Sequence, residues 1–303
     1  MSQVDGLVVI DKPTGCTSHD VVARCRRIFS QKKVGHAGTL DPDATGVLLV
    51  GLGQATRLLQ WLTGLSKHYT GEIVLGIATN TLDAGGEVTG KWDMSTVTLE
   101  AARAAAAQLT GEITQVPPMV SALKVGGRRL HELARAGVEV ERAARPVTVR
   151  RFGVELAGPG PVLAIDVECG SGTYVRSLAA DLGTLLGGGA HLRNLRRVAV
   201  GSFSVDSAVT LEELEASPTR LDAVLAPAAA LPGMEKAVVG PEVALAVGYG
   251  RMLTVDMLAG GGSRGPGPWA VLAEDGRLLA VYQAHGVGQA KPAVVLASSG
   301  SPD

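Results

Sequence analysis

The sequence predicts an α+β protein with a large N-terminal domain and a small C-terminal β module. The chain has 303 residues, of which 46% are hydrophobic, and this length suffices for one large domain plus a small one, or for two domains. Strand-like and helix-like segments occur together before residue 228. A Pro- and Ala-rich stretch at 226–233 then leads into short apolar runs with Gly turns, which are typical of a small β domain.

The individual elements are predicted from apolar runs, β-favouring residues and capping signals. Strands are expected, in chain order, at residues 6–10, 47–50, 67–76, 146–157 and 162–169. Helices are expected at about 19–29, 58–65, 98–109 and 175–186, with a short one after Thr210. Thr17 or Ser18 is the candidate N-cap of the first helix, and Thr98 is that of the Ala-rich third helix.

Composition narrows the function mainly by exclusion. The formal net charge is −1, so any surface that binds nucleic acid has to be local. Three cysteines without paired spacing fit a reducing compartment. The sequence has no signal peptide and no apolar run of membrane-spanning length, which predicts a soluble, cytoplasmic protein without a membrane partner. It also lacks metal-ligand clusters and nucleotide fingerprints, so no metal, nucleotide or other cofactor is expected.

The stretch at residues 34–57 concentrates polar groups on a turn that leads into an apolar run. Pro42 fixes its own φ and pushes Asp41 into an extended conformation. The residues alone leave two interpretations open. Asp41 is either a turn aspartate that bonds its own backbone or a site carboxylate held beside a buried strand.

This stretch resembles the catalytic motif of the bacterial tRNA pseudouridine-55 synthases of the TruB type. It reads Gly-His-Ala-Gly-Thr-Leu-Asp-Pro at 35–42, followed by Ala-Thr-Gly at 44–46 and Gly-Gln-Ala-Thr-Arg at 53–57. Companion motifs of that family follow in order: Lys-x-Tyr at 67–69, Gln-x-Pro-Pro-x-x-Ser-Ala-x-Lys at 115–124, Gly-Thr-Tyr-x-Arg at 172–176 and Gly-Ala-x-x-x-x-Leu-Arg-Arg at 189–197. The resemblance covers residues 6–220 and, more weakly, the C-terminal module.

The resemblance implies the pseudouridine synthase fold, with a central mixed, largely antiparallel sheet flanked by helices. The catalytic domain would span residues 1–228, with an RNA-binding insertion at about 115–150, and a PUA-like domain would span 233–303. The implied reaction converts uridine 55 in the T loop of tRNA to pseudouridine on a flipped-out base. The implied partner is therefore the T stem-loop of tRNA, and a monomer is expected.

The resemblance also implies the roles of the central residues. Asp41 would be the catalytic carboxylate, Arg176 would pair with it through its planar fork, and Tyr69 would stack on the flipped base. Asp41 would attack the anomeric carbon of ribose or the uracil ring, or would remove a proton from ribose C2′. The alternative for Tyr69 is a core or edge tyrosine.

Three further residues are implied to contact the base. His36 would help to expel it from the T loop, Tyr174 would line its pocket, and Leu195 would pack against it. The alternatives are a turn histidine for His36 and an ordinary core leucine for Leu195.

Basic residues gather in two segments of this near-neutral chain. The first helix and the loop after it contribute Arg24, Arg27 and Lys32, and a second segment at 124–151 begins with Lys124, Arg128 and Arg129. Both segments could be solvated faces. The first leads directly into the Asp41 loop, which favours contact with phosphate. For the second, the resemblance implies an arm that grips the RNA backbone, so that affinity falls with salt. Two other functions remain open: a tRNA-folding chaperone, and a synthase of the same fold that acts on another RNA.

Overall fold

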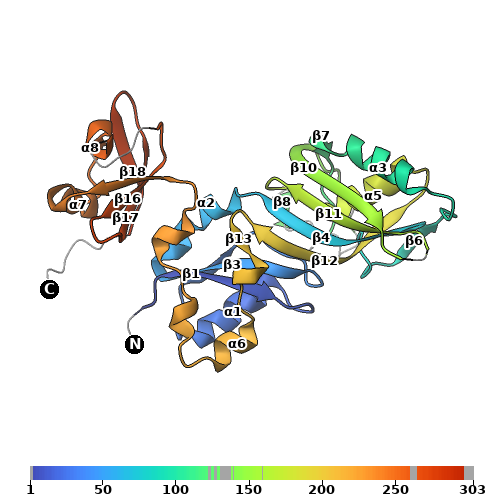
Figure 1. Ribbon diagram of the computed structural model, residues 1–303, viewed down its shortest axis with the longest axis horizontal. Helices are drawn as coiled ribbons and strands as arrows, with labels where there is room; N and C mark the ends of the chain where they lie inside the picture. Colours follow the sequence, from blue (N-terminus) through green and yellow to red (C-terminus); the bar gives the residue numbers. More distant parts are fainter. Residues whose placement is uncertain are drawn as a thin grey trace.

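The structure is a computed structural model, and it describes residues 3–121, 138, 140–158, 160–259 and 265–296, with the backbone alone at 124–125 and 128–129. The molecule is elongated (Figure 1), and a large sheet occupies its middle and one end. A smaller sheet, built from the C-terminal residues, lies at the other end.

Nine strands of the described chain form the large sheet. Along its main path lie, in spatial order, β1 (Gly6–Lys12), β3 (Thr45–Leu52), β12 (Ala190–Val200), β4 (Lys67–Leu75), β11 (Val162–Cys169), β10 (Arg145–Leu156) and β7 (Gly111–Gln115). β2 (Val34–Ala37) pairs with β3, and β13 (Phe203–Ser204) pairs with β12. Only β12 and β3 run parallel among these pairs. The mixed, largely antiparallel sheet of the prediction is therefore confirmed.

Helices bury the apolar side chains of this sheet in two separate clusters. α1 (Ser18–Ile28) and α6 (Leu211–Ala216) pack on β1 and β3, whereas α3 (Leu99–Gln108) and α5 (Val175–Leu185) pack on β4, β10 and β11. The caps expected from the sequence are present, because the hydroxyls of Thr17, Thr98 and Thr210 each accept a hydrogen bond from the backbone of the following turn. The α+β class is thus confirmed.

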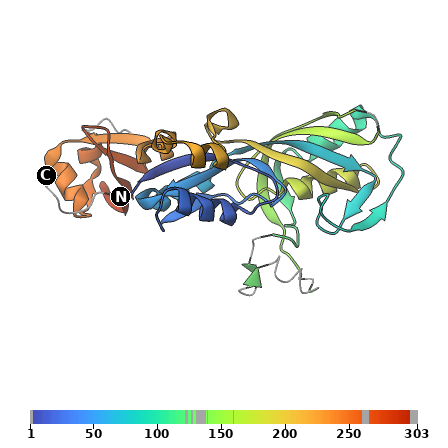
Figure 2. The same cartoon turned by 90° about the horizontal axis from the view of Figure 1, so that it is seen from below.

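Some elements differ from the sequence-based expectations. The segment expected as a helix at 58–65 consists of a 3₁₀ turn, η1 (Gly53–Leu58), and a short α2 (Leu59–Thr63). Strand β12 was not predicted, because Arg193, Arg196 and Arg197 obscure its apolar alternation and its pairing with β4 is interrupted by register shifts. The described chain also contains smaller hairpins, in which β5 (Ile77–Thr79) pairs with β6 (Val88–Lys91) and β8 (Lys124–Val125) pairs with β9 (Arg128–Arg129). The β8–β9 hairpin lies apart from the large sheet (Figure 2).

Gly46 permits the close approach of β3 and β12 near the site. Its φ is +103°, a conformation that favours glycine, and a Cβ at this position would collide with the backbone carbonyl of Arg197. Gly46 and Arg197 are register partners of the parallel pair. The approach therefore brings Arg197 next to the strand that follows Asp41.

The smaller sheet has the order β14 (Glu235–Val239), β16 (Trp269–Ala273), β17 (Leu278–Ala284), β18 (Gln289–Val295) and β15 (Leu253–Thr254), accompanied by α7 (Pro241–Gly248) and α8 (Val255–Ala259). The Pro- and Ala-rich stretch at 226–233 contains the 3₁₀ turn η4 (Pro227–Ala230), which follows η2 (Val205–Ser207) and η3 (Arg220–Ala223). Ala230 and Leu231 are buried in a cluster with apolar residues of both sheets. This segment is thus packed rather than solvated, and the PUA-like character of the second sheet stays a prediction.

Candidate active site

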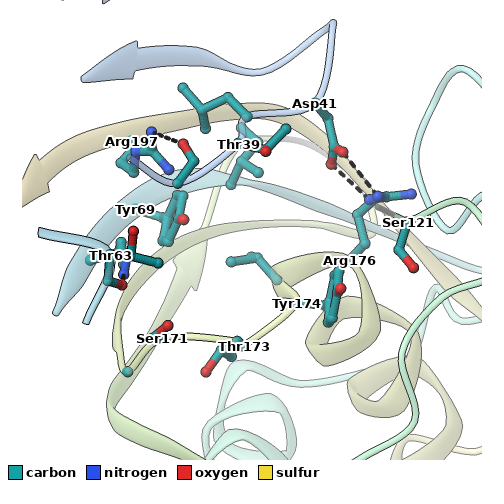
Figure 3. A pocket seen from close by; sticks show the side chains of 17 residues that line it. Thr39, Asp41, Thr63, Tyr69, Ser121, Ser171, Thr173, Tyr174, Arg176 and Arg197 are labelled. Atoms are coloured by element: carbon teal, nitrogen blue, oxygen red, sulfur yellow. Dashed lines mark hydrogen bonds and ion pairs between the residues drawn. The ribbon is translucent and has the colours of Figure 1, made fainter. Parts of the chain in front are cut away.

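A pocket lies where the loop between β2 and β3 meets strands β4 and β12 and the start of α5 (Figure 3). Two groups of side chains face it from opposite sides. Asp41, Tyr174 and Arg176 lie on one side, and Tyr69 and Arg197 lie on the other. Sequence motifs far apart in the chain therefore converge on one cavity.

The loop that carries Asp41 is braced from both flanks. On one flank, the Ser18 hydroxyl accepts a hydrogen bond from the Leu40 backbone N–H at 2.9 Å. On the other, the buried Lys12 ammonium donates to the Pro42 carbonyl at 3.0 Å and also to the carbonyls of Pro13 and Cys16. These bonds fix the backbone on each side of the aspartate, so its carboxylate is held at the pocket edge.

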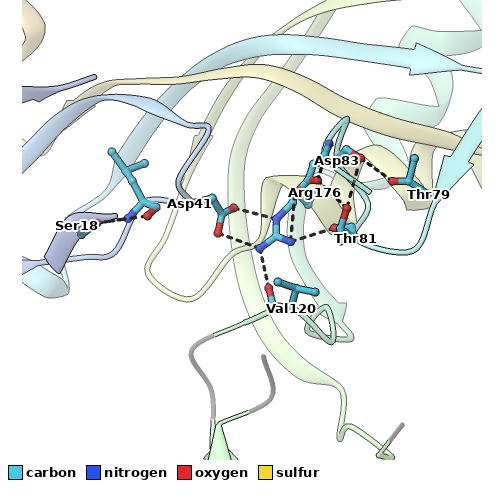
Figure 4. Close-up of polar contacts among 9 residues, drawn as sticks. Ser18, Asp41, Thr79, Thr81, Asp83, Val120 and Arg176 are labelled. Carbon is cyan, nitrogen blue, oxygen red and sulfur yellow. Dashed lines mark hydrogen bonds and ion pairs between the residues drawn. The ribbon is translucent and has the colours of Figure 1, made fainter. Parts of the chain in front are cut away.

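The Asp41 carboxylate bonds Arg176 through both of its oxygens (Figure 4). Arg176 Nε lies 2.9 Å from Asp41 Oδ2, and Nη2 donates to Oδ1 at 3.0 Å. The arginine side chain is 4% exposed, whereas the aspartate side chain is 41% exposed. This forked geometry fixes the direction of the carboxylate and leaves it accessible from the pocket.

The remaining donors of Arg176 are also occupied. It donates to the carbonyl oxygens of Thr81 at 3.0 Å and Val120 at 2.8 Å, and Nη1 lies 3.4 Å from Asp83 Oδ2. Asp83 in turn accepts hydrogen bonds from the Thr81 hydroxyl and the Gly85 backbone N–H. The Thr-x-Thr-x-Asp segment at 79–83 thus holds the arginine, a role that was not predicted from the sequence. The feature that could have indicated this role is an acid in a turn that follows two threonines.

Opposing influences act on the pKa of the Asp41 carboxyl. Burial raises it above the usual range, because the charged form loses water. The Arg176 guanidinium opposes that rise, and the nearby negative charge of Asp83 adds to it. The carboxyl therefore keeps a higher proton affinity than a carboxylate paired with arginine at the surface.

Tyr69 forms the opposite side of the pocket, beside Arg197. The tyrosine is 9% exposed, and burial raises the pKa of its hydroxyl while the nearby Arg197 charge opposes the rise. Arg197 also donates from Nε to the Val47 carbonyl at 2.7 Å and from Nη2 to the Gly38 carbonyl at 3.0 Å. One guanidinium beside the tyrosine therefore links the Asp41 loop to β3, a contact that the sequence did not indicate.

Tyr174 and Leu195 complete the lining that the sequence predicted. The Tyr174 backbone is clamped by the Gln115 side chain, which accepts from its N–H at 2.8 Å and donates to its carbonyl at 3.0 Å. Leu195 follows Asn194, whose φ of +52° coincides with a register shift in β12. Gln115 belongs to one of the family motifs, but its role in holding the Tyr174 backbone was not predicted from the sequence.

The other predicted residues lie away from this lining or outside the described side chains. The His36 ring packs edge-on against His19 at 5.3 Å and does not line the pocket, and burial lowers the pKa of His36 to about 4. Arg24 forms ion pairs with Glu212 and Glu215. Two of the predicted cations are exposed, namely Arg27 and Lys32. The side chains of Lys124, Arg128 and Arg129 lie outside the described residues.

Metal-binding clusters and membrane-spanning helices are both absent from the described ranges. These ranges contain no group of three or more His, Cys, Asp or Glu residues that could hold a metal ion. No helix within them is long and apolar enough to cross a membrane.

Comparisons with known proteins decide the family. Residues 26–175 match the N-terminal domain of the TruB family pseudouridylate synthases, and residues 176–231 match the C-terminal domain of tRNA pseudouridylate synthase B. The chain is 48% identical to the tRNA pseudouridine synthase B of Arthrobacter sp. (strain FB24), with 98% of both chains covered. The chain belongs to the TruB family of pseudouridine synthases.

Other relatives of the TruB family agree with this assignment. The tRNA pseudouridine synthase B of Mycolicibacterium paratuberculosis is 47% identical, with 96% of this chain and 97% of the relative covered. Among solved structures, a Cbf5–Nop10–Gar1 complex contains a chain that superposes with a TM-score of 0.75 at 27% identity, covering 97% of this chain and 85% of that one. The pseudouridine synthase fold is thereby confirmed.

Proposed function

We propose that this TruB-family chain isomerises uridine 55 in the T loop of tRNA to pseudouridine, with Asp41 as the catalytic carboxylate. One observation carries the proposal: a half-exposed carboxylate is held by an arginine fork at the edge of a pocket with a tyrosine opposite. A flipped base needs a flat aromatic face on which to stack and a reactive group at the ribose edge. Tyr69 and Asp41 supply these two features, and the relatives named tRNA pseudouridine synthase B support tRNA as the substrate.

The chemistry required is a rearrangement within one nucleotide. The C1′–N1 bond breaks, uracil turns in the pocket, and a C1′–C5 bond forms while the C5 proton leaves to water and N1 gains one. Asp41 acts at C1′, at the uracil ring or on the C2′ proton, and in each case the carboxylate has to be aimed at its target atom. The arginine fork meets that need because it fixes both carboxylate oxygens.

Release of tritium from C5-labelled uridine in a tRNA transcript tests the proposal. Wild-type protein is expected to release tritium, and Asp41→Asn is expected to release none while still binding the tRNA. A matched transcript with cytidine at position 55 and label only in uridine serves as the control for position. Binding without release by the wild type would favour a folding chaperone, and release from the cytidine transcript would point to another position.

Further proposals concern how the RNA is held. A monomer would bind the T stem-loop through the exposed Arg27 and Lys32 and the basic segment that starts at Lys124. The catalytic domain would span residues 1–228, and the PUA-like domain would span 233–303. The PUA-like domain would contact another part of the tRNA. The protein would act in the cytoplasm. An isolated T stem-loop should therefore be a substrate, its affinity should fall with salt, and light scattering should give the mass of one chain.

A further inference from the structure

Two buried cations line the pocket beside Tyr69. Lys67 is 7% exposed and Arg197 is 1% exposed. The Lys67 ammonium donates to the backbone carbonyls of Thr63 and Leu65 at 2.6 and 2.7 Å, and Arg197 likewise donates to two backbone carbonyls. The proposed function gives neither charge a task.

Neither charge is neutralised by an acid of the described chain. No carboxylate within the described ranges forms an ion pair with Lys67 or Arg197, and Asp41, the acid that lines the same pocket, is bonded by Arg176. Carbonyl oxygens carry only partial charge, whereas buried cations are usually paired with acids. Two buried cations side by side in a cleft therefore produce a positive field at the position of the bound base.

Each charge persists at neutral pH. Burial, together with the neighbouring Arg197 charge, lowers the pKa of Lys67 to about 8, so most of the lysine is still protonated at pH 7. An arginine is always charged in proteins. The Cys169 thiol that faces Lys67 does not balance them, because burial raises the pKa of Cys169 to about 11.

The reaction creates a negative charge in this pocket. When the C1′–N1 bond breaks, its electron pair stays on N1 and spreads over O2 and O4 of uracil. The same uracil anion forms if Asp41 displaces the base at C1′. It also forms if Asp41 takes the C2′ proton, because the C2′–H bonding pair then becomes the C1′–C2′ double bond. If Asp41 adds to the ring instead, the added pair rests on O4. The charge disappears when C5 bonds to C1′ and the carboxylate or C2′ returns to its starting state. The C5 proton then leaves to water while N1 gains one, so the product is neutral.

We propose that Lys67 and Arg197 form a cationic wall that stabilises the negative charge on uracil and so speeds its departure from ribose. The inference rests on the proposed function. Arg197 and Tyr69 line the same side of the pocket, and the Arg197 charge acts on the tyrosine hydroxyl, so the wall lies beside the ring on which the base would stack. Preorganised charges aimed at developing charge act strongly in a site that excludes water.

The test compares two leaving groups in the same tRNA position. Transcripts contain uridine or 5-fluorouridine, whose base is the stronger acid and leaves as a more stable anion. Single-turnover loss of the original nucleoside at position 55 is followed by nuclease digestion and chromatography. The variants are Lys67→Met and Lys67→Gln, because glutamine keeps a donor for the Thr63 and Leu65 carbonyls and removes the charge. Lys91→Met, on an exposed lysine, is the matched control.

We expect both Lys67 variants to react about 10- to 100-fold more slowly with uridine. The loss with 5-fluorouridine should be a clearly smaller factor, because its anion needs less stabilisation, and Lys91→Met should match the wild type. Equal losses on both substrates would mean that Lys67 only shapes the pocket and would overturn the inference, as would wild-type rates. A wild type that leaves uridine 55 unchanged would overturn the proposed function instead.

Discussion

The two sides of the pocket hold their arginines in opposite ways. On one side, Arg176 bonds Asp41 through both carboxylate oxygens and lies near Asp83, so its charge is balanced. On the other side, Arg197 and Lys67 bond backbone carbonyls and meet no acid of the described chain. The first guanidinium supplies geometry, since it aims a carboxylate, and the second supplies an electric field. The same residue type thus serves two purposes, which depend on what accepts its hydrogen bonds.

The largest effect that would test this contrast is expected from Arg176→Lys. An ammonium keeps the charge but cannot bond both oxygens of Asp41, so turnover should fall about 100- to 1,000-fold while tRNA affinity stays near normal. Single-turnover tritium release and filter binding measure the two quantities. Near-normal turnover would mean that charge, rather than the fork, is what Asp41 requires.

Replacing the other arginine should lower stability in addition to turnover. Arg197→Met leaves the carbonyls of Val47 and Gly38 without their donor, and each such buried group costs about 1–3 kcal/mol. Urea unfolding should therefore show a loss of a few kcal/mol. Arg24→Met is the control, because its ion pairs lie at the surface, where such pairs contribute little to stability. Equal losses in the two variants would contradict the structural role of Arg197.

The pH dependence of turnover should separate the two sides further. Lys67, with its pKa lowered to about 8, is charged below that pH and neutral above it. The single-turnover rate of the wild type should thus fall as the pH rises through about 8, and Lys67→Met should lack this fall. The charge of Arg197 and the protonated Cys169 that face Lys67 do not titrate in this range. An identical decline in both proteins would assign it to another group.

The smallest expected effect concerns His36, outside the pocket lining. Burial lowers the pKa of His36 to about 4, so between about 4 and 6.5 the unfolded chain binds a proton that the folded chain does not. The free energy of unfolding should therefore decrease as the pH falls through this window. His36→Gln should reduce the slope in urea titrations at pH 4.5 and 7. An unchanged slope would mean that His36 accepts the proton without loss of stability.

How far the sequence could predict this site depends on the range of the contacts. Local patterns located the caps at Thr17, Thr98 and Thr210, but the residues alone favoured a turn aspartate at position 41. Only the family resemblance connected it with Arg176. Asp83 and Arg197 were missed as partners, because a turn acid and a strand arginine show nothing locally of what they bond across the fold. Strand β12 was missed for a related reason, since Arg193, Arg196 and Arg197 interrupt its apolar pattern, and the residues that they bond lie far away in the sequence.

The spacing of these bonds along the chain has a consequence for folding. Asp41 and Arg176 are 135 residues apart, and the Arg197 bonds to Val47 and Gly38 span 150 and 159 residues. Contacts of such long range form slowly, because a large loop must close before they give any stabilisation. A nascent chain therefore carries Asp41 long before it has either arginine. Competence to modify RNA is a late event in the life of the molecule, and it arises only once strand β12 has taken its place between β3 and β4.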